Sequence, residues 1–156
     1  MKSSKHFETR AVRSQSEPSH NREHTSSIYA TSSFTFENAE QARAMFANEI
    51  EGNIYSRFSN PSNDEFITKL CALEEIEDGV STASGMAAMF LSIASFLDQG
   101  DHLVASRALF GSTHQVITQV LPRWGITYTY VDTKDPSSWE EAIRENTRML
   151  LLETPS

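Results

Sequence analysis

Residues 84–88 read Ser-Gly-Met-Ala-Ala and connect two apolar segments through a turn of small residues. The run before the turn, 80–84, predicts a short buried strand, and residues 86–97 after it predict an apolar helix. Gly85 stands where this helix would begin, so no side chain covers the first backbone N–H groups. Those N–H groups have no partners within the helix, and the positive end of the helix dipole lies beside them. The turn therefore predicts an anion site that binds phosphate.

After residue 79 the chain alternates short apolar runs with segments of helical length. The runs at 102–105 and 149–152 are almost continuously apolar, which is typical of parallel strands covered on both faces. We expect a mainly parallel α/β sheet, because strands alternating with helices of this length form such sheets. The expected strands lie near 80–84, 101–106, 126–131 and 147–153. The expected helices lie near 86–97, 112–123 and 137–145.

The first part of the chain is organised differently. Residues 1 to about 27 are polar and without periodicity, so on their own they would remain disordered. Residues 28–36 read as an extended segment, and Asn38 can cap a helix over 39–49. A loop follows, and a second helix is expected from about residue 63. Its apolar stripe at helical spacing consists of Phe66, Ile67, Leu70, Leu73 and Ile76.

Composition narrows the class of protein. The 156 residues are 38% hydrophobic and 22% charged, which suits a soluble globular chain with one real core. The net charge of −8 and the lack of a basic run argue against a nucleic-acid partner. A single cysteine, Cys71, excludes an internal disulfide and is compatible with a reducing compartment. No apolar run has the length of a membrane span, so we expect a cytoplasmic protein without a membrane partner.

Two further segments carry groups suited to a flat, phosphorylated ligand. Arg57 offers a planar cationic fork that matches a phosphate, and the nearby Tyr55 adds a hydroxyl donor. Phe110 lies between an expected strand end and an expected helix start, where its ring could stack on a flat ring. Taken alone, each has a simpler interpretation, namely a surface arginine and a core aromatic residue.

Other reactive side chains are better explained by structure. His20 and His24 are spaced for a metal on a helix, but their segment has neither a helical stripe nor a third ligand, so we expect no metal site. His102 reads as a strand-start residue. His114 reads as a structural histidine on a helix beside the site. Cys71 lies on the apolar side of its helix and reads as a small core residue.

In this order and spacing, the segments together resemble the Cys/Met-metabolism family of pyridoxal-phosphate (PLP) enzymes, over nearly the whole chain. The family resemblance implies an N-terminal arm followed by the first, incomplete part of a fold-type I PLP large domain with a mainly parallel sheet. The segments that carry it are Glu8-Thr9-Arg10-Ala11-Val12-Arg13, residues 28–34, Tyr55-Ser56-Arg57 with Asn60-Pro61, Ser84-Gly85-Met86-Ala87-Ala88 and Glu153-Thr154-Pro155-Ser156.

The resemblance also implies roles for five residues. The backbone amides of Gly85 and Met86 would hold the phosphate of pyridoxal 5'-phosphate. Tyr55 and Arg57 would reach that phosphate from the neighbouring subunit, so the active site would exist only in a homodimer or homotetramer. Phe110 would stack on the pyridine ring, without the hydroxyl that most relatives carry there.

The implied reaction is a γ-replacement in methionine biosynthesis on an amino-acid substrate. Phe110 followed by Gly-Ser-Thr looks most like the O-succinylhomoserine sulfhydrylase branch, which would use sulfide to displace succinate and form homocysteine. Methionine lyases typically have Cys at the position of Ser112, which counts against that activity. Cystathionine γ-synthase and O-acetylhomoserine sulfhydrylase on the same scaffold remain open. An alternative that is not an enzyme is a complete, non-catalytic module that binds phosphate.

The family's chemistry also needs a lysine that holds the cofactor, and in relatives this residue follows the Glu-Thr-Pro-Ser segment. We therefore expect no catalytic residue in this chain, which would be an inactive fragment holding half of a cofactor pocket. Residues 1–62 would form the arm and inter-subunit loop, and residues 63–156 the first part of the cofactor domain. The four lysines present read as solvated surface charges: Lys2, Lys5, Lys69 and Lys134.

Overall fold

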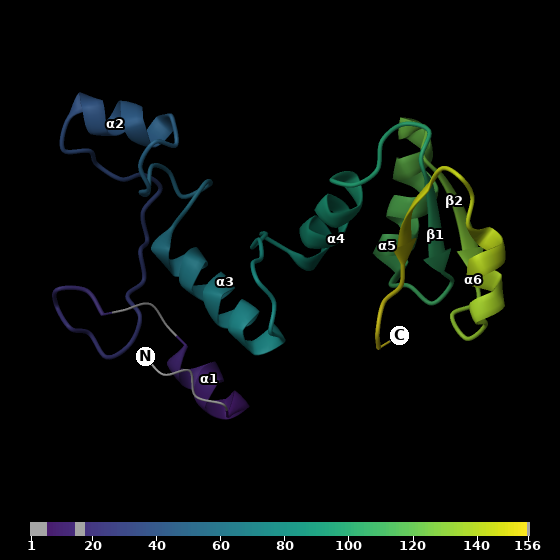
Figure 1. The fold of residues 1–156 in the computed structure, drawn as a ribbon, viewed down its shortest axis with the longest axis horizontal. Helices are drawn as coiled ribbons and strands as arrows, with labels where there is room; N and C mark the ends of the chain where they lie inside the picture. Colours follow the sequence, from purple (N-terminus) through teal and green to yellow (C-terminus); the bar gives the residue numbers. More distant parts are fainter. Residues whose placement is uncertain (1–5, 15–17, 156) are drawn as a thin grey trace. The chain divides into compact units, whose positions relative to one another are not determined.

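The computed structural model describes residues 6–14 and 18–155. The chain divides into two compact units, Met1–Ser81 and Thr82–Ser156, and each is described by itself. Figure 1 shows the elements of both units along the chain. The division expected between residues 62 and 63 separates an inter-subunit arm from a cofactor domain. A single chain contains neither a second subunit nor a cofactor, so this division stays a prediction.

The second unit is built on a three-stranded sheet with the order β2-β1-β3. The strands are β1 (His102–Ser106), β2 (Thr127–Val131) and β3 (Thr147–Leu151), and β1 pairs in parallel with both neighbours. The expected parallel α/β sheet is thus confirmed. All five residues of the central strand are buried, as expected for the run at 102–105.

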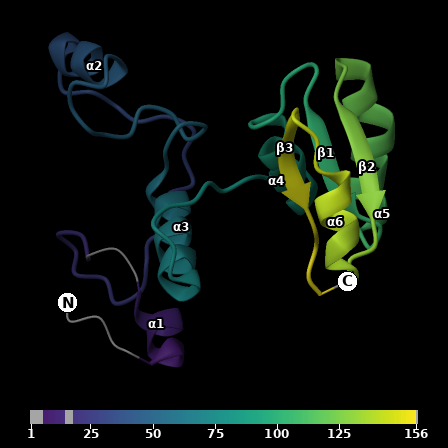
Figure 2. The same ribbon diagram turned by 45° about the vertical axis from the view of Figure 1, so that its right-hand side comes forward.

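Helices cover both faces of this sheet (Figure 2). The helix α4 (Gly85–Ala94) and the helix α5 (Gly111–Gln115) lie on one face, and α6 (Pro136–Ala142) lies on the other. The helical path after α5 continues as a π-helical turn, Val116–Val120, and a 3-10 turn, Leu121–Trp124. The expected helix over 112–123 is therefore one continuous run whose hydrogen-bonding pattern changes as it approaches Pro122, which has no N–H to donate.

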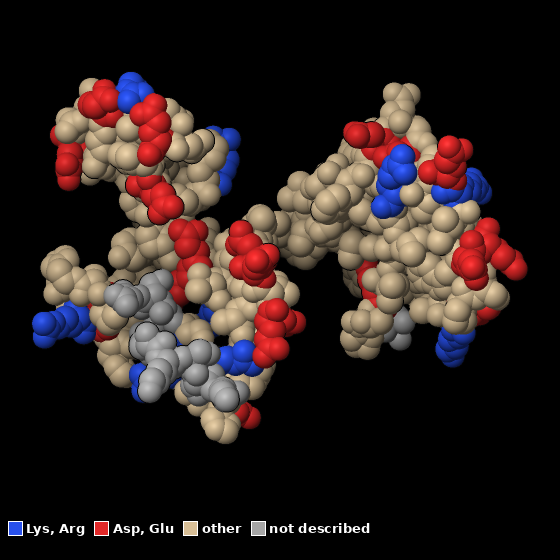
Figure 3. All heavy atoms as spheres, in the orientation of Figure 1, with Lys and Arg blue, Asp and Glu red and all other residues tan. Residues whose placement is uncertain are grey.

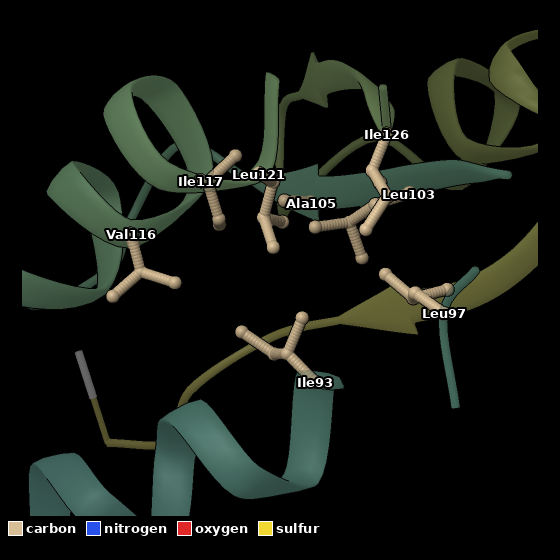
Figure 4. Close-up of a cluster of buried hydrophobic side chains, with 8 residues drawn as sticks. All are labelled: Ile93, Leu97, Leu103, Ala105, Val116, Ile117, Leu121 and Ile126. Atoms are coloured by element: carbon tan, nitrogen blue, oxygen red, sulfur yellow. The ribbon is translucent and has the colours of Figure 1, made fainter. Parts of the chain in front are cut away.

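The core of the second unit lies between β1 and the α4–α5 face (Figure 4). Ile93 of α4 points toward the sheet, where Leu103 and Ala105 of β1 lie on one face two residues apart. Each fully buried Leu or Ile side chain contributes about 1.5–3 kcal/mol relative to exposure. The eight buried members are Ile93, Leu97, Leu103, Ala105, Val116, Ile117, Leu121 and Ile126.

Two strand expectations are wrong. Residues 80–84 form no strand, and the side chain of Val80 is 87% exposed. An extended segment needs a neighbouring strand for its backbone groups, and none of the described residues pairs with this one. The run at 149–152 is not covered on both faces, because β3 is an edge strand in which Met149 and Leu151 turn inward while Leu150 is half exposed.

The described residues of the first unit form three helices, α1 (Phe7–Arg13), α2 (Ala39–Phe46) and α3 (Pro61–Glu74). The helix α1 lies within the segment expected to be disordered on its own, and residues 1–5 and 15–17 of that segment lie outside the described residues. Packing against α3 explains the order, since Arg10 Nη1 donates to the carbonyl oxygen of Ala72 at 2.9 Å.

Local capping starts the other two helices of the first unit. Asn38 accepts a hydrogen bond from the Gln41 N–H at 2.9 Å, which confirms the expected start of α2. Asn60 caps α3 by accepting from the Ser62 N–H, and α3 begins at Pro61, two residues earlier than expected. The expected apolar stripe of α3 is largely exposed within this chain, and Ile76 lies beyond the end of the helix.

Among the described residues, no helix is long and apolar enough to cross a membrane. Figure 3 shows acidic side chains spread over the face that it draws, with the described basic side chains scattered among them. This distribution matches the net charge of −8.

Candidate cofactor-binding site

The turn before α4 leaves two backbone amides outside the helical hydrogen bonds. Ser84 is extended, its Oγ accepts from the Ala87 N–H at 3.1 Å, and its carbonyl oxygen accepts from the Ala88 N–H at 3.0 Å. The amides of Gly85 and Met86 precede both bonds, at the positive end of a ten-residue helix. This local geometry is the one that binds phosphate groups in other helices.

The turn is also open. Gly85 is exposed, and a Cβ atom placed on it would meet no heavy atom within 4 Å. The space beside the Gly85 Cα atom, where a side chain would lie, is therefore empty of described atoms. The residues present fit the phosphate end of PLP.

Phe110 lies at the start of α5, and its side chain is 67% exposed. The loop that carries it follows the carboxyl end of β1, the edge of a parallel sheet where ligands usually bind. Within the second unit α4 contacts α5, and both Met86 and Leu109 pack against the buried core cluster. The structure thus places Phe110 and the Gly85 turn at the starts of two helices that contact each other within one unit, and the ring of Phe110 is exposed.

Glu153 is a member of this site for which the sequence predicts no individual role. Its Oε2 atom accepts from the Phe110 N–H at 2.6 Å, and its Oε1 atom accepts from the Thr113 hydroxyl at 2.7 Å. The sequence signal that could have found it is its place just after β3, since the carboxyl ends of parallel strands meet at one edge.

Tyr55 and Arg57 lie together in the first unit. The Arg57 guanidinium carbon lies 5.7 Å from the centroid of the Tyr55 ring and 4.8 Å from that of Phe58. Both Tyr55 and Arg57 are exposed, and Arg57 contributes to the wall of a hollow of about 390 Å³. These groups belong to a different compact unit from Gly85, so their meeting at one phosphate stays a prediction.

A short antiparallel contact holds the Tyr55–Arg57 loop. Tyr55 forms a single bridge with Ser33, and the Ser56 N–H donates to the carbonyl oxygen of Ser32 at 2.9 Å. The Phe34 N–H donates to the carbonyl oxygen of Ile54 at 3.2 Å. The loop thus presents its cation and hydroxyl from a backbone anchored on both sides of Tyr55.

The histidines near the sheet have structural partners. His102 begins β1, and its Nδ1 and Nε2 atoms lie 2.8 and 2.9 Å from the hydroxyls of Thr147 and Thr129. Burial, aided by the positive charge of Arg144, lowers the pKa of His102 and keeps it neutral. His114 Nδ1 lies 2.9 Å from the Tyr130 hydroxyl, and the two rings stack. Both histidines therefore have side-chain partners within the second unit.

Two other expectations concern Cys71 and metals. Cys71 is buried on α3, which confirms it as a core residue. Within residues 6–14 and 18–155, no cluster of three or more His, Cys, Asp or Glu side chains could hold a metal ion.

Similarity to characterised proteins extends over almost all of the chain. It is 39% identical over 150 residues to the O-succinylhomoserine sulfhydrylase of Pseudomonas aeruginosa, covering 96% of this chain and 37% of that protein. It is 42% identical over 129 residues to the L-methionine gamma-lyase of Treponema denticola, covering 83% of this chain and 32% of that protein. The chain thus spans about a third of the length of these relatives.

A solved structure has the same fold. A Campylobacter jejuni protein, solved with N'-pyridoxyl-lysine-5'-monophosphate, matches with a TM-score of 0.91 and 33% identity, over 98% of this chain and 38% of that one. Residues 8–156 also match the family described as Cys/Met metabolism PLP-dependent enzyme. Together with the open glycine turn and the parallel sheet, this match shows that the chain belongs to the family of PLP-dependent enzymes of cysteine and methionine metabolism.

Proposed function

We propose that the protein encoded by the complete reading frame, hereafter the complete protein, is a PLP-dependent sulfhydrylase. It would convert O-succinylhomoserine and sulfide to homocysteine by γ-replacement, in methionine biosynthesis. The observation that supports this most is the open turn at Gly85, in the same compact unit as the exposed aromatic ring of Phe110, in a chain similar to an O-succinylhomoserine sulfhydrylase over 96% of its length.

Five residues of this chain would hold the cofactor. The amides of Gly85 and Met86 would donate to its phosphate, and Phe110 would stack on its ring. Arg57 and Tyr55 of a second copy would add a charge-assisted hydrogen bond and a hydroxyl donor to the same phosphate. When bound, PLP supplies an electron sink for carbanion chemistry.

The part that this chain contributes is binding and orientation. A ring fixed by stacking and a phosphate fixed by amides together set the position of a planar group, because they anchor it at two separate points. Phe110 has no hydroxyl, so it would exclude water from one face of the ring and would not carry a proton. We assign no proton transfer to a residue of this chain.

The shared phosphate site makes assembly part of the proposal. If Arg57 and Tyr55 act from a second copy, the complete protein binds cofactor fully only as a homodimer or a larger homo-oligomer. Sedimentation of the complete protein at several concentrations, with cofactor content measured in each species, tests this. A monomer with full cofactor content would contradict it.

We also propose a cytoplasmic location, since a free buried Cys71 suits a reducing compartment.

The activity is tested with purified, PLP-loaded complete protein. We expect homocysteine from O-succinylhomoserine plus sulfide, at a higher kcat/KM than from O-acetylhomoserine plus sulfide. Replacing sulfide with L-cysteine tests for cystathionine formation. A preference for the acetyl ester or for cysteine would replace the proposed activity by the corresponding sister activity on the same scaffold.

A second candidate is γ-elimination. It is favoured by the 42% identity to the Treponema denticola L-methionine gamma-lyase. Incubation with methionine alone distinguishes the two, since elimination releases methanethiol, ammonia and 2-oxobutanoate without any added nucleophile. Methanethiol release faster than homocysteine formation would favour the lyase.

A further inference from the structure

The carboxylate of Glu153 connects the end of β3 to the start of α5. It accepts from the Phe110 N–H at 2.6 Å and from the Thr113 hydroxyl at 2.7 Å, one hydrogen bond to each of its oxygens. Thr113 is only 1% exposed, so its hydroxyl depends on this partner within the described structure. Both bonds are charge-assisted, and such bonds are about twice as strong as neutral ones.

This arrangement replaces a cap that α5 cannot supply from its own sequence. In a capping box, the side chain of the third helical residue reaches back to the backbone N–H of the capping residue. The capping residue here is Phe110, which has no side-chain acceptor, and the third helical residue is Thr113, whose hydroxyl is too short to do so. Glu153, in the segment that follows β3 and 43 residues from Phe110 along the chain, accepts from the Phe110 N–H instead, and its other oxygen accepts from the Thr113 hydroxyl.

We propose that Glu153 is a positioning residue for the cofactor ring. It holds the backbone of Phe110 in its extended conformation at the helix start and so sets where the exposed aromatic ring stands. The inference rests on the proposed function, in which Phe110 stacks on the ring of PLP. The carboxylate itself need not touch substrate or cofactor.

The same contact could serve stability alone, so the test needs a control that removes the same kinds of hydrogen bond at another helix start. Asp135 provides it, because its carboxylate accepts from the Ser137 N–H at 3.0 Å and from the Ser137 hydroxyl at 2.6 Å at the start of α6. Asp135→Ala removes the same two kinds of bond as Glu153→Ala, on the opposite face of the sheet from α5.

The experiment uses the complete protein and compares Glu153→Ala, Glu153→Gln, Asp135→Ala and Phe110→Leu. Three quantities are measured: the melting temperature, the dissociation constant of PLP by equilibrium dialysis, and the visible circular dichroism of the bound cofactor at saturation. The dichroism reports how the ring is held, and loss of stability alone does not change it below the melting transition.

We expect Glu153→Ala to raise the dissociation constant of PLP about tenfold and to change the dichroism band. Glu153→Gln should recover most of both, because its amide oxygen can accept from Phe110 and its amide N–H can donate to Thr113. Asp135→Ala should also lower the melting temperature, by less because its partners are exposed to water, and should leave both cofactor readouts unchanged.

Three results would overturn the inference. If Phe110→Leu changes the dichroism and Glu153→Ala does not, the positioning role is wrong while the proposed site stands. If Asp135→Ala changes the cofactor readouts as much as Glu153→Ala, the role of Glu153 is general stability. If Phe110→Leu changes neither readout, the proposed stacking role is wrong, and the role of Glu153 falls with it.

Discussion

The side-chain amide of Asn60 donates a hydrogen bond of 3.1 Å to the carbonyl oxygen of Tyr29. The same amide nitrogen lies 2.9 Å from the Ser56 hydroxyl oxygen, and the amide oxygen accepts from the Ser62 N–H at 2.9 Å. One buried side chain therefore caps α3, ties the loop before it to the 29–34 segment, and supports the backbone that presents Arg57.

Asn60→Ala should destabilise the first unit by about 1–3 kcal/mol, because it removes a helix cap and leaves buried groups without a partner. The free energy of unfolding from urea denaturation measures the change. Asn60→Asp is the matched variant, since it keeps the cap acceptor but cannot donate to Tyr29. We expect an intermediate loss, and a wild-type value for Asn60→Asp would show that the donated bonds contribute nothing.

Arg57→Gln should weaken PLP binding by the complete protein about 10- to 100-fold, the value of one charge-assisted hydrogen bond. The melting temperature of the cofactor-free protein should not change, because Arg57 is exposed. Arg123→Gln is the control, an exposed arginine of the 3-10 turn that has no part in the proposed site. Equal PLP affinity in Arg57→Gln and the wild type would remove this loop from the cofactor site.

Gly85→Ala separates folding from binding. An added Cβ meets nothing within 4 Å, so the cofactor-free protein should keep its stability within about 1 kcal/mol. PLP affinity should fall, because the methyl group would occupy the space through which a phosphate approaches the amides. Gly111→Ala controls for stability, since Gly111 also begins a helix in open space. Unchanged affinity in Gly85→Ala, measured by equilibrium dialysis, would contradict the assigned phosphate position.

Because of His102, the folded protein should be less stable in mild acid than at neutral pH. Burial lowers its pKa when folded, so between that value and the unfolded value of about 6.5 the unfolded chain binds more protons. This contribution to stability is complete above pH 6.5 and is lost as the pH falls through that window, by up to about 1.4 kcal/mol per pH unit.

The pH effect is measured from unfolding free energies at pH 7.5 and 5.5. His102→Gln should be less stable at pH 7.5 but should lose less on acidification than the wild type. His20→Gln, a change at an exposed histidine of the first unit, is the control variant. An identical loss in His102→Gln and the wild type would show that His102 does not cause it.

The features that the sequence predicted well are local or strongly patterned. The capping residue Asn38, the start of α4 at Gly85 and the buried strand at 102–106 each depend on a few adjacent residues. The open turn at Gly85 follows from the same local rule, because a residue without a side chain stands at a helix start.

The features that it missed depend on partners far along the chain. The segment at 80–84 has the composition of a strand, but a strand also needs a neighbour to pair with, and composition does not provide one. The helix α1 is held by Arg10 reaching Ala72, a contact 62 residues apart. The role of Glu153 cannot be predicted for the same reason, since its hydrogen bonds with Phe110 and Thr113 exist only once β3 lies beside β1.

The central claim is that the cofactor phosphate binds at the start of α4, and a crystal structure of the complete protein with PLP tests it most directly. We predict phosphate oxygens within about 2.7–3.2 Å of the backbone nitrogens of Gly85 and Met86. A phosphate bound elsewhere, with side chains packed over these two nitrogens, would contradict the account.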